Sequence, residues 1–239
     1  MDSSKKGLYI AFEGIDGSGK GTQINKFMKR INRLIPTAPV LTTEPSDGPI
    51  GKLIRSKYLT SKRISDPQTL RLLYAADRLD NITNTDNGIK NILDSGTSVV
   101  SDRCFLSSCA YDTYRILMDD QNKSIPEKTN SDFDSEVLRV LSVNSQSLKL
   151  CIPDIIFFID VPADIAMKRI ETRGKAKELY EDLYKLSTIS KAYKWAISII
   201  RDNDYKTNIY IIDGNDTEEN IADTIMNYTE YKLRERHLI

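Results

Sequence analysis

The sequence predicts an α/β fold with a doubly wound, five-stranded parallel sheet that is flanked by helices. Five short apolar runs alternate along the 239 residues with segments whose apolar side chains recur at helical spacing. The run at 154–161 is apolar almost throughout, which is typical of a central parallel strand that is covered on both faces. A glycine-rich turn joins the first run to the first helical segment, as it does in phosphate-binding loops.

The first strand is expected at 8–12 and the first helix at 23–34, with the glycine-rich turn at 13–22 between them. The glycines leave room for backbone N–H groups to surround a phosphate, and the helix N-terminus adds partial positive charge. An ordinary glycine-rich turn is the alternative, which the order strand, turn, helix disfavours. We expect the phosphates of a nucleotide to bind Gly14, Gly17, Ser18, Gly19, Lys20, Gly21 and Thr22.

The other elements follow in order along the chain. Further strands are expected at 40–45, 98–102, 154–161 and 208–213. Helices are expected at 50–58, 66–93, 105–118, 133–150, from 163 onward, in a long stretch ending near 203, and at 216–233. The polar segment at 119–135 is expected to be a surface insertion. No linker or repeat interrupts the sequence, so we expect residues 1–239 to form a single domain.

The composition excludes several classes of partner. The 34 Lys and Arg residues balance the 34 Asp and Glu residues, so neither nucleic acid nor a membrane surface is an expected partner. No apolar run approaches the roughly 20 residues of a membrane helix, and the N-terminus lacks the apolar core of a signal peptide. The three cysteines and the single histidine are too few and too scattered for a metal site of the zinc type. The expected location is the cytoplasm, where thiols stay reduced.

Polar residues follow the first three predicted strands: Glu13-Gly14, Thr43-Glu44-Pro45 and Asp102-Arg103. Because the carboxyl ends of parallel strands share one edge of the sheet, these residues are expected to converge. In order and spacing the sequence resembles the thymidylate kinase family over nearly its whole length. The matching segments are 12–20, 44–45, 50–55, 72–78, 102–103 with Ser107, 110–111, 153–154, and an Arg-Gly pair with 178–181. The resemblance implies a P-loop nucleoside monophosphate kinase fold that has a short lid at 169–185 and forms a homodimer.

The resemblance also implies how a thymine nucleotide would bind. Tyr74 and Arg78 lie four apart on one helix face, where the ring would stack on thymine and the guanidinium would donate to its carbonyl edge. Asp16 would hold the 3′-hydroxyl, and Tyr111 would exclude a 2′-hydroxyl. Ser108 is expected among the substrate-binding residues. The plainer alternatives are a loop-capping carboxylate and a helix with a half-buried tyrosine and a surface arginine.

For the acceptor phosphate, the resemblance implies a clamp by Arg103, with Arg55 as a second candidate. Glu44 would orient these two arginines and the waters of the metal. Asp102 would hold Mg²⁺ through water. Thr22 would serve through a bound water as well, because position 21 is glycine instead of a hydroxyl residue. A strand-end ion pair is the alternative for Asp102 and Arg103.

The segment around Gly174 resembles the lid. Arg173 would neutralise charge as the γ-phosphoryl group moves, and Arg169 would bind the phosphates of ATP. A lid arginine is expected because Gly17 stands where some members of the family carry an arginine in the phosphate loop. The alternative is a solvated basic helix end, which is the usual fate of a charge run.

The implied reaction moves the γ-phosphoryl group of ATP onto dTMP, with Lys20, Asp16, Arg103 and Arg173 as catalytic residues and Mg²⁺ as cofactor. A deoxynucleoside kinase is the nearest alternative, since it also has a phosphate loop and an Asp-Arg pair. A noncatalytic nucleotide-binding module is a third possibility. A GTPase switch is excluded, because neither Asn-Lys pair, at 25–26 and 122–123, continues as the guanine-reading motif.

Overall fold

The computed structural model describes residues 6–59, 66–119, 130–173, 182–203 and 205–239. Its strands form one parallel sheet in the order β2-β3-β1-β4-β5, which confirms the predicted doubly wound fold. The strands are β1 (Tyr9–Glu13), β2 (Val40–Thr43), β3 (Val99–Asp102), β4 (Ile155–Asp160) and β5 (Asn208–Asp213). The second strand ends earlier than expected, so that Glu44 and Pro45 lie in the loop that follows it.

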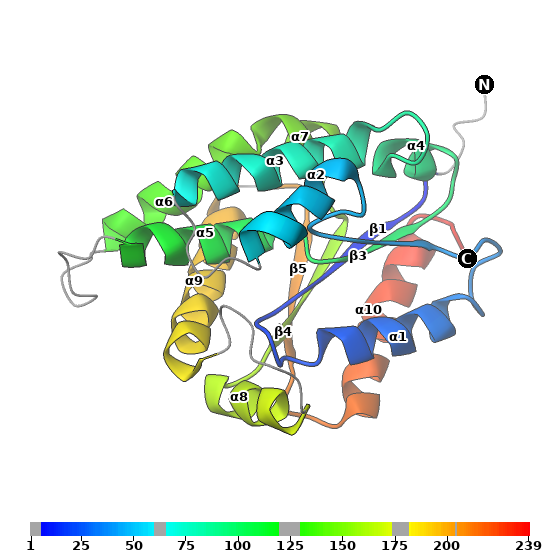
Figure 1. The fold of residues 1–239 in the computed structure, drawn as a ribbon. Helices are drawn as coiled ribbons and strands as arrows, with labels where there is room; N and C mark the ends of the chain where they lie inside the picture. Colours follow the sequence, from blue (N-terminus) through cyan, green and yellow to red (C-terminus); the bar gives the residue numbers. More distant parts are fainter. Residues whose placement is uncertain (1–5, 60–65, 120–129, 174–181, 204) are drawn as a thin grey trace.

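Helices cover both faces of the sheet. Figure 1 shows α1 and α10 packed together on one side, and α5, α6 and α9 grouped on the other. The helices are α1 (Lys20–Ile31), α2 (Pro49–Leu53) with a π-helical continuation η1 (Ile54–Leu59), α3 (Pro67–Thr83), α4 (Ile89–Asp94), α5 (Phe105–Asp119), α6 (Asn130–Val143), α7 (Ser145–Leu150), α8 (Ala163–Thr172), α9 (Leu183–Asp202) and α10 (Glu218–Glu235). In the part of the chain that the structure describes, every helix is too short or too polar to cross a membrane.

The core is built around the two central strands β1 and β4. Every residue of β1 is buried, and so are five of the six residues of β4, as expected for strands covered on both faces. The ring of Phe12 lies 5.2 Å from Phe27 on α1 and 5.5 Å from Phe157 on β4, measured between ring centroids. This packing holds the phosphate loop, which leaves the end of β1, on a rigid support.

The predicted helix at 66–93 is two helices. A turn separates α3 from α4, because the side chain of Asn84 accepts hydrogen bonds from the backbone N–H groups of Asp86 and Asn87. At Gly88 a Cβ would lie 2.4 Å from the backbone oxygen of Asn84, so only glycine fits this turn. The start of the helix, at Asp66-Pro67, is as predicted, and Asp66 caps it by accepting from the N–H of Gln68.

The predicted helix at 133–150 is also divided, at Asn144. The amide of Asn144 turns back to donate to the carbonyl of Val140, which places its side-chain oxygen toward the interior. The first half, α6, already begins at residue 130, so the expected insertion at 119–135 is shorter than predicted at its carboxyl end. Residues 120–129, the rest of that insertion, lie outside the described residues.

Candidate active site

The ends of three neighbouring strands bring the predicted site residues together. Phe12 on β1 pairs in register with Asp102 on β3, and Asp102 pairs in turn with Thr43 on β2. Glu13, Arg103 and Glu44 therefore leave the same edge of the sheet from adjacent strands. This arrangement confirms the predicted convergence of the three loops.

The glycine-rich loop has the backbone that its sequence requires. Gly17 and Gly19 have φ values of 79° and 94°, which L side chains rarely adopt. Gly19 is the last residue before α1, so the N-terminus of that helix opens directly onto the loop. Lys20 follows, with its Nζ 3.7 Å from a carboxylate oxygen of Asp102. Burial, and then the nearby charge of Arg103, lower the pKa of Lys20.

Helix α8 packs against this loop. A Cβ at Gly17 would lie 2.4 Å from the backbone oxygen of Ala166, so a larger side chain has no room at this position. Arg169 donates to the carbonyls of Ser18, at 3.3 Å, and of Gly214, at 3.0 Å. Its described contacts thus join α8 to the loop and to the end of β5, and its contact with ATP stays a prediction. Arg173 is exposed at the end of α8.

Much of the predicted lid, including Lys175 and the segment 178–181, lies outside the described residues.

Arg103 is the most heavily bonded side chain of the site. Its Nη1 donates to the carbonyl of Gly14 and to the hydroxyls of Ser107 and Tyr193, all within 3.2 Å. Its Nη2 donates to Asp16 at 2.5 Å and to the Tyr111 hydroxyl at 3.3 Å. Burial alone would lower the pKa of Arg103, but the surrounding Tyr111 and Asp16 outweigh it and hold that pKa above its ordinary value.

The backbone of Arg103 has a φ of 77°, which is unusual for a residue other than glycine. Its N–H donates to the carbonyl of Phe12 at 2.9 Å, and its own carbonyl accepts from the Ser101 hydroxyl at 2.6 Å. Such a backbone costs about 1–3 kcal/mol and persists where neighbouring contacts hold it in place. The sharp turn after β3 directs the guanidinium back toward the phosphate loop.

Glu13 and Tyr193 support this arginine. The sequence pattern placed Glu13 among the converging strand-end residues but gave it no role, and it did not identify Tyr193. Glu13 is fully buried, and its carboxylate accepts from the backbone N–H groups of Cys104 and Ser107 at the start of α5. It also accepts from the hydroxyls of Ser107 and Tyr193. A buried carboxylate at a strand end was a signal for Glu13, whereas Tyr193 looks like any core residue of a helix.

Glu44 forms a buried pair with Arg78 on α3. Its carboxylate accepts from Nε at 2.8 Å and from Nη2 at 2.5 Å, and Arg78 also donates to Ser108 and to Asn144. The described partners of Arg55 and Arg103 are other groups, and the role of Glu44 in orienting those two arginines stays a prediction. Burial raises the pKa of Glu44 despite the adjacent guanidinium. In turn Glu44 more than offsets the effect of burial on Arg78, whose pKa is raised.

The loop after β2 is held from two sides. Arg55 donates to the carbonyls of Pro45 and Ser46 and to the carboxylate of Asp47, and the Glu44–Pro45 peptide is cis. Ser46 also donates from its N–H, at 2.7 Å, and from its hydroxyl, at 2.6 Å, to the buried Asp77. Tyr74 lies half-buried on α3, one turn before Arg78. The predicted base-binding residues thus share one helix face beside this loop.

Known proteins resemble the chain over most of its length. The family model for thymidylate kinase matches residues 12–130. A protein of Prochlorococcus marinus (strain NATL2A) named thymidylate kinase is 33% identical over 92% of this chain and 94% of its own length. A probable thymidylate kinase of Methanococcus maripaludis (strain S2) is 34% identical over 77% of this chain and 75% of its own length. A probable thymidylate kinase of Thermococcus kodakarensis is 36% identical over 75% of this chain and 78% of its own length.

The chain belongs to the thymidylate kinase family. It is therefore a phosphotransferase of the P-loop kinase fold, as the sequence predicts.

A thymidylate kinase is expected to use Mg²⁺, and the residues beside the phosphate loop fit that ion. Asp102 has one carboxylate oxygen that is buried without a hydrogen-bond partner, next to Lys20. Thr22 places a hydroxyl on the exposed start of α1. Mg²⁺ typically takes one or two protein oxygens and completes its shell with water and phosphate. Among the described residues, no three or more His, Cys, Asp and Glu side chains come together in a group that could hold a metal ion.

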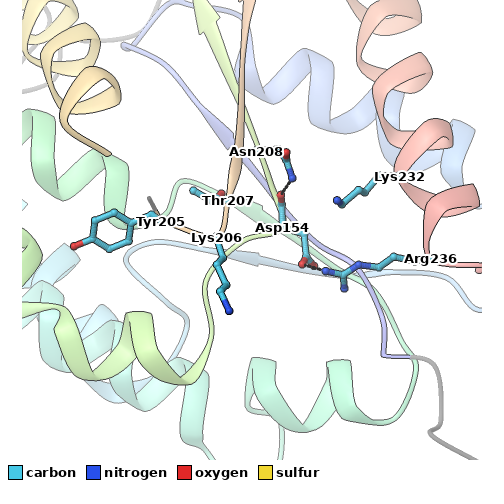
Figure 2. A pocket seen from close by; sticks show the side chains of 7 residues that line it. All are labelled: Asp154, Tyr205, Lys206, Thr207, Asn208, Lys232 and Arg236. Carbon is cyan, nitrogen blue, oxygen red and sulfur yellow. Dashed lines mark hydrogen bonds and ion pairs between the residues drawn. The ribbon is translucent and has the colours of Figure 1, made fainter. Parts of the chain in front are cut away.

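A separate pocket of about 320 Å³ lies at the opposite edge of the sheet, where β4 and β5 begin (Figure 2). It is lined by Asp154, Tyr205, Lys206, Thr207, Asn208, Lys232 and Arg236. Two of the basic side chains that line it already form ion pairs within the protein, Arg236 with Asp154 and Lys232 with Glu235. Because ligands of open parallel sheets bind at the carboxyl ends of the strands, this pocket is not the nucleotide site of the family.

Proposed function

We propose that the chain transfers the γ-phosphoryl group of ATP to the phosphate of dTMP, giving ADP and dTDP. The observation that carries the proposal is the placement of three groups on adjacent strand ends. The phosphate loop after β1, Arg103 after β3 and the Glu44–Arg78 pair after β2 lie side by side. A phosphoryl donor, an acceptor phosphate and a pyrimidine base then each have a place along one edge. The names of the relatives point to the same substrate.

The reaction needs alignment more than it needs a base. The second pKa of a phosphate monoester is about 6, so the acceptor oxygen of dTMP is already ionised near neutral pH. The acceptor oxygen of dTMP attacks the γ-phosphorus of ATP. At the same time the bond from the γ-phosphorus to the oxygen that bridges the β- and γ-phosphates breaks, and ADP leaves with this bridging oxygen. Lys20 would offset charge on the donor phosphates, and Arg103 would hold the acceptor in line. Arg173, together with Arg169, is proposed to offset the charge on the moving group.

Asp102 and Thr22 would hold Mg²⁺, with water between Asp102 and the metal. When bound, the ion would neutralise charge on the β- and γ-phosphates of ATP. A carboxylate oxygen of Asp102 that is buried, accepts no hydrogen bond and lies 3.7 Å from Nζ of Lys20 supports this assignment.

Asp16 occupies part of the place that we assign to the acceptor phosphate. Its carboxylate accepts from Nη2 of Arg103 at 2.5 Å and from the Tyr111 hydroxyl at 3.2 Å. We expect the phosphate of dTMP to take over this N–H group, which releases Asp16 to accept from the 3′-hydroxyl of the sugar. Tyr111 lies beside both groups, where it would restrict the space for a 2′-hydroxyl.

The test is a panel of acceptors with ATP, comprising dTMP, thymidine, dUMP, dCMP, dGMP and AMP. We expect dTMP to be consumed with the highest kcat/KM. Consumption of thymidine and not of dTMP would establish the deoxynucleoside kinase alternative. Binding of ATP without phosphorylation of any acceptor would establish a noncatalytic module.

We also propose that two copies of the chain form a homodimer through the helices beside the base-binding face. Leu72 on α3 is 58% exposed, and Leu138 on α6 is 47% exposed, on two helices that pack against each other. Burial of such side chains against a second copy would contribute about 25 cal/mol per Å² of apolar surface. Sedimentation analysis of Leu72→Asp tests this, with a monomer as the expected result.

The cytoplasm remains the proposed location, since all three cysteines are free thiols.

A further inference from the structure

We infer that Tyr193 is a positioning residue for phosphoryl transfer: its buried hydroxyl holds the guanidinium of Arg103 in the orientation that receives the acceptor phosphate. The inference rests on the proposed role of Arg103 in binding dTMP. Tyr193 lies on α9, 90 residues from Arg103, and its side chain is completely buried.

The hydroxyl of Tyr193 connects a carboxylate to a guanidinium. It lies 2.9 Å from a carboxylate oxygen of Glu13 and 3.1 Å from Nη1 of Arg103. A carboxylate accepts only, and a guanidinium donates only. The phenol O–H therefore donates to Glu13, and the phenol oxygen accepts from Arg103. The negative charge of Glu13 favours this direction, because it polarises the hydroxyl and strengthens its oxygen as an acceptor.

Ser107 forms a second, parallel connection. Its hydroxyl donates to Glu13 at 2.7 Å and accepts from Nη1 of Arg103 at 3.1 Å. The hydroxyls of Ser107 and Tyr193 are themselves 2.9 Å apart. Glu13 and Arg103 thus form an ion pair that is bridged by two hydroxyls instead of being in direct contact.

These contacts divide the guanidinium into two ends with different partners. Nη1 is held by three uncharged oxygens, from Gly14, Ser107 and Tyr193. Nη2 carries the charged partner, Asp16, at the place we assign to the phosphate. An anchored Nη1 fixes the direction of Nη2. This matters because a long arginine side chain loses rotamer freedom when it is ordered.

The ring of Tyr193 is itself fixed by packing. It lies 5.0 Å from Phe158 on β4 and meets Tyr111 edge-on at 6.1 Å, between ring centroids. A phenylalanine would keep these contacts and lose only the hydroxyl. Tyr193→Phe therefore removes one hydrogen-bond acceptor from Arg103 and leaves the shape of the core unchanged.

The experiment compares dTMP with thymidine, which lacks the phosphate, by calorimetric titration of the wild type and of Tyr193→Phe. We expect the affinity for dTMP to fall about tenfold, as for the loss of one hydrogen bond to a charged group, while the affinity for thymidine is unchanged. The KM for ATP is expected to be unchanged as well. A role in stability alone would lower both affinities together, or neither.

Two further variants sharpen the result. Tyr210→Phe is the matched control and should change neither affinity. The ring of Tyr210 stacks on Phe157 and Tyr228, away from Arg103. Ser107→Ala removes the parallel hydroxyl and should reproduce the selective loss of dTMP affinity, including in the event that Tyr193→Phe does not fold. Equal dTMP-to-thymidine ratios in the wild type, Tyr193→Phe and Ser107→Ala would overturn the inference. A wild type that does not prefer dTMP over thymidine would instead refute the proposed function, and the inference with it.

Discussion

Both carboxylate oxygens of Glu44 accept hydrogen bonds from the guanidinium of Arg78, at 2.8 Å from Nε and at 2.5 Å from Nη2. The two side chains are only 5% and 4% exposed. This paired geometry is the strongest that an arginine and a carboxylate can form. It ties the loop after β2 to α3, so that the arginine predicted to read the base is also part of the folded framework.

Replacement of this arginine is therefore expected to destabilise the fold as well as to weaken base recognition. Arg78→Ala leaves the buried carboxylate of Glu44 without its counterion, which typically costs about 3–5 kcal/mol of unfolding free energy. Urea unfolding measures the loss. Arg234→Ala is the control, because Arg234 is 69% exposed and its ion pair with Glu230 should contribute at most about 1 kcal/mol. Equal losses in the two variants would contradict the prediction.

Tyr74 offers a cleaner test of base recognition. Stacking of a base on an aromatic ring is worth about 1–3 kcal/mol, so Tyr74→Leu should raise the KM for dTMP by about tenfold or more. The KM for ATP and the urea midpoint should change little, since leucine keeps an apolar side chain at this half-buried position. An equal rise in both KM values would mean that Tyr74 does not bind the base.

The phosphate loop should tolerate a methyl group at one glycine and reject it at another. Gly17→Ala requires an L residue at a φ of 79° and places its Cβ 2.4 Å from the carbonyl of Ala166, so we expect a loss of about 1–3 kcal/mol of unfolding free energy. Gly21 lies in α1 with nothing within 4 Å of a Cβ, so Gly21→Ala should raise the unfolding free energy by about 0.5–1 kcal/mol. Urea unfolding of both variants checks the pair, and a stabilising Gly17→Ala would refute it.

Stability is expected to fall in alkali because of the buried thiols. Burial raises the pKa of Cys109 to about 12, whereas the pKa of a thiol in the unfolded chain is about 8.5. The contribution of this thiol to the unfolding free energy is complete at a pH below its pKa in the unfolded chain. It is lost as the pH rises toward its pKa in the folded protein, because the unfolded chain releases the proton first. The measurement is the unfolding free energy between pH 8 and pH 10.5.

Above pH 9 a single thiol of this kind contributes a slope of up to about 1.4 kcal/mol per pH unit. Cys109→Ala should therefore reduce the slope without removing it, since burial also raises the pKa of Cys151 to about 12. An unchanged slope in Cys109→Ala would show that this thiol does not take part.

The metal assignment predicts a specific defect for Asp102. Asp102→Asn keeps the shape of the side chain and removes its charge, so the Mg²⁺ concentration at half-maximal rate should rise by about tenfold or more, as expected for the loss of a metal-holding carboxylate. A calorimetric titration of ADP without Mg²⁺ is the control and should match the wild type. An unchanged Mg²⁺ dependence would remove Asp102 from the metal site.

Local pattern was sufficient for the elements whose cause is local. The strand, glycine turn and helix around Lys20 lie within some two dozen consecutive residues, and the apolar run at 154–161 shows its central position by composition alone. The pattern failed where a polar side chain redirected the backbone. Asn84 and Asn144 each end a helix by bonding to nearby backbone groups, and apolar periodicity does not register such bonds.

The sequence by itself therefore determined the fold class, the phosphate loop and the candidate residues at the strand ends. Only the tertiary structure decided their partners, such as Glu44 with Arg78, Gly17 with Ala166, and Tyr193 with Glu13, which is 180 residues away. The physical reason is that periodicity shows which face of a helix or strand is buried. It does not show which distant side chain packs against that face. Those contacts depend on how helices and strands pack, and a contact across the fold leaves no local trace in the chain.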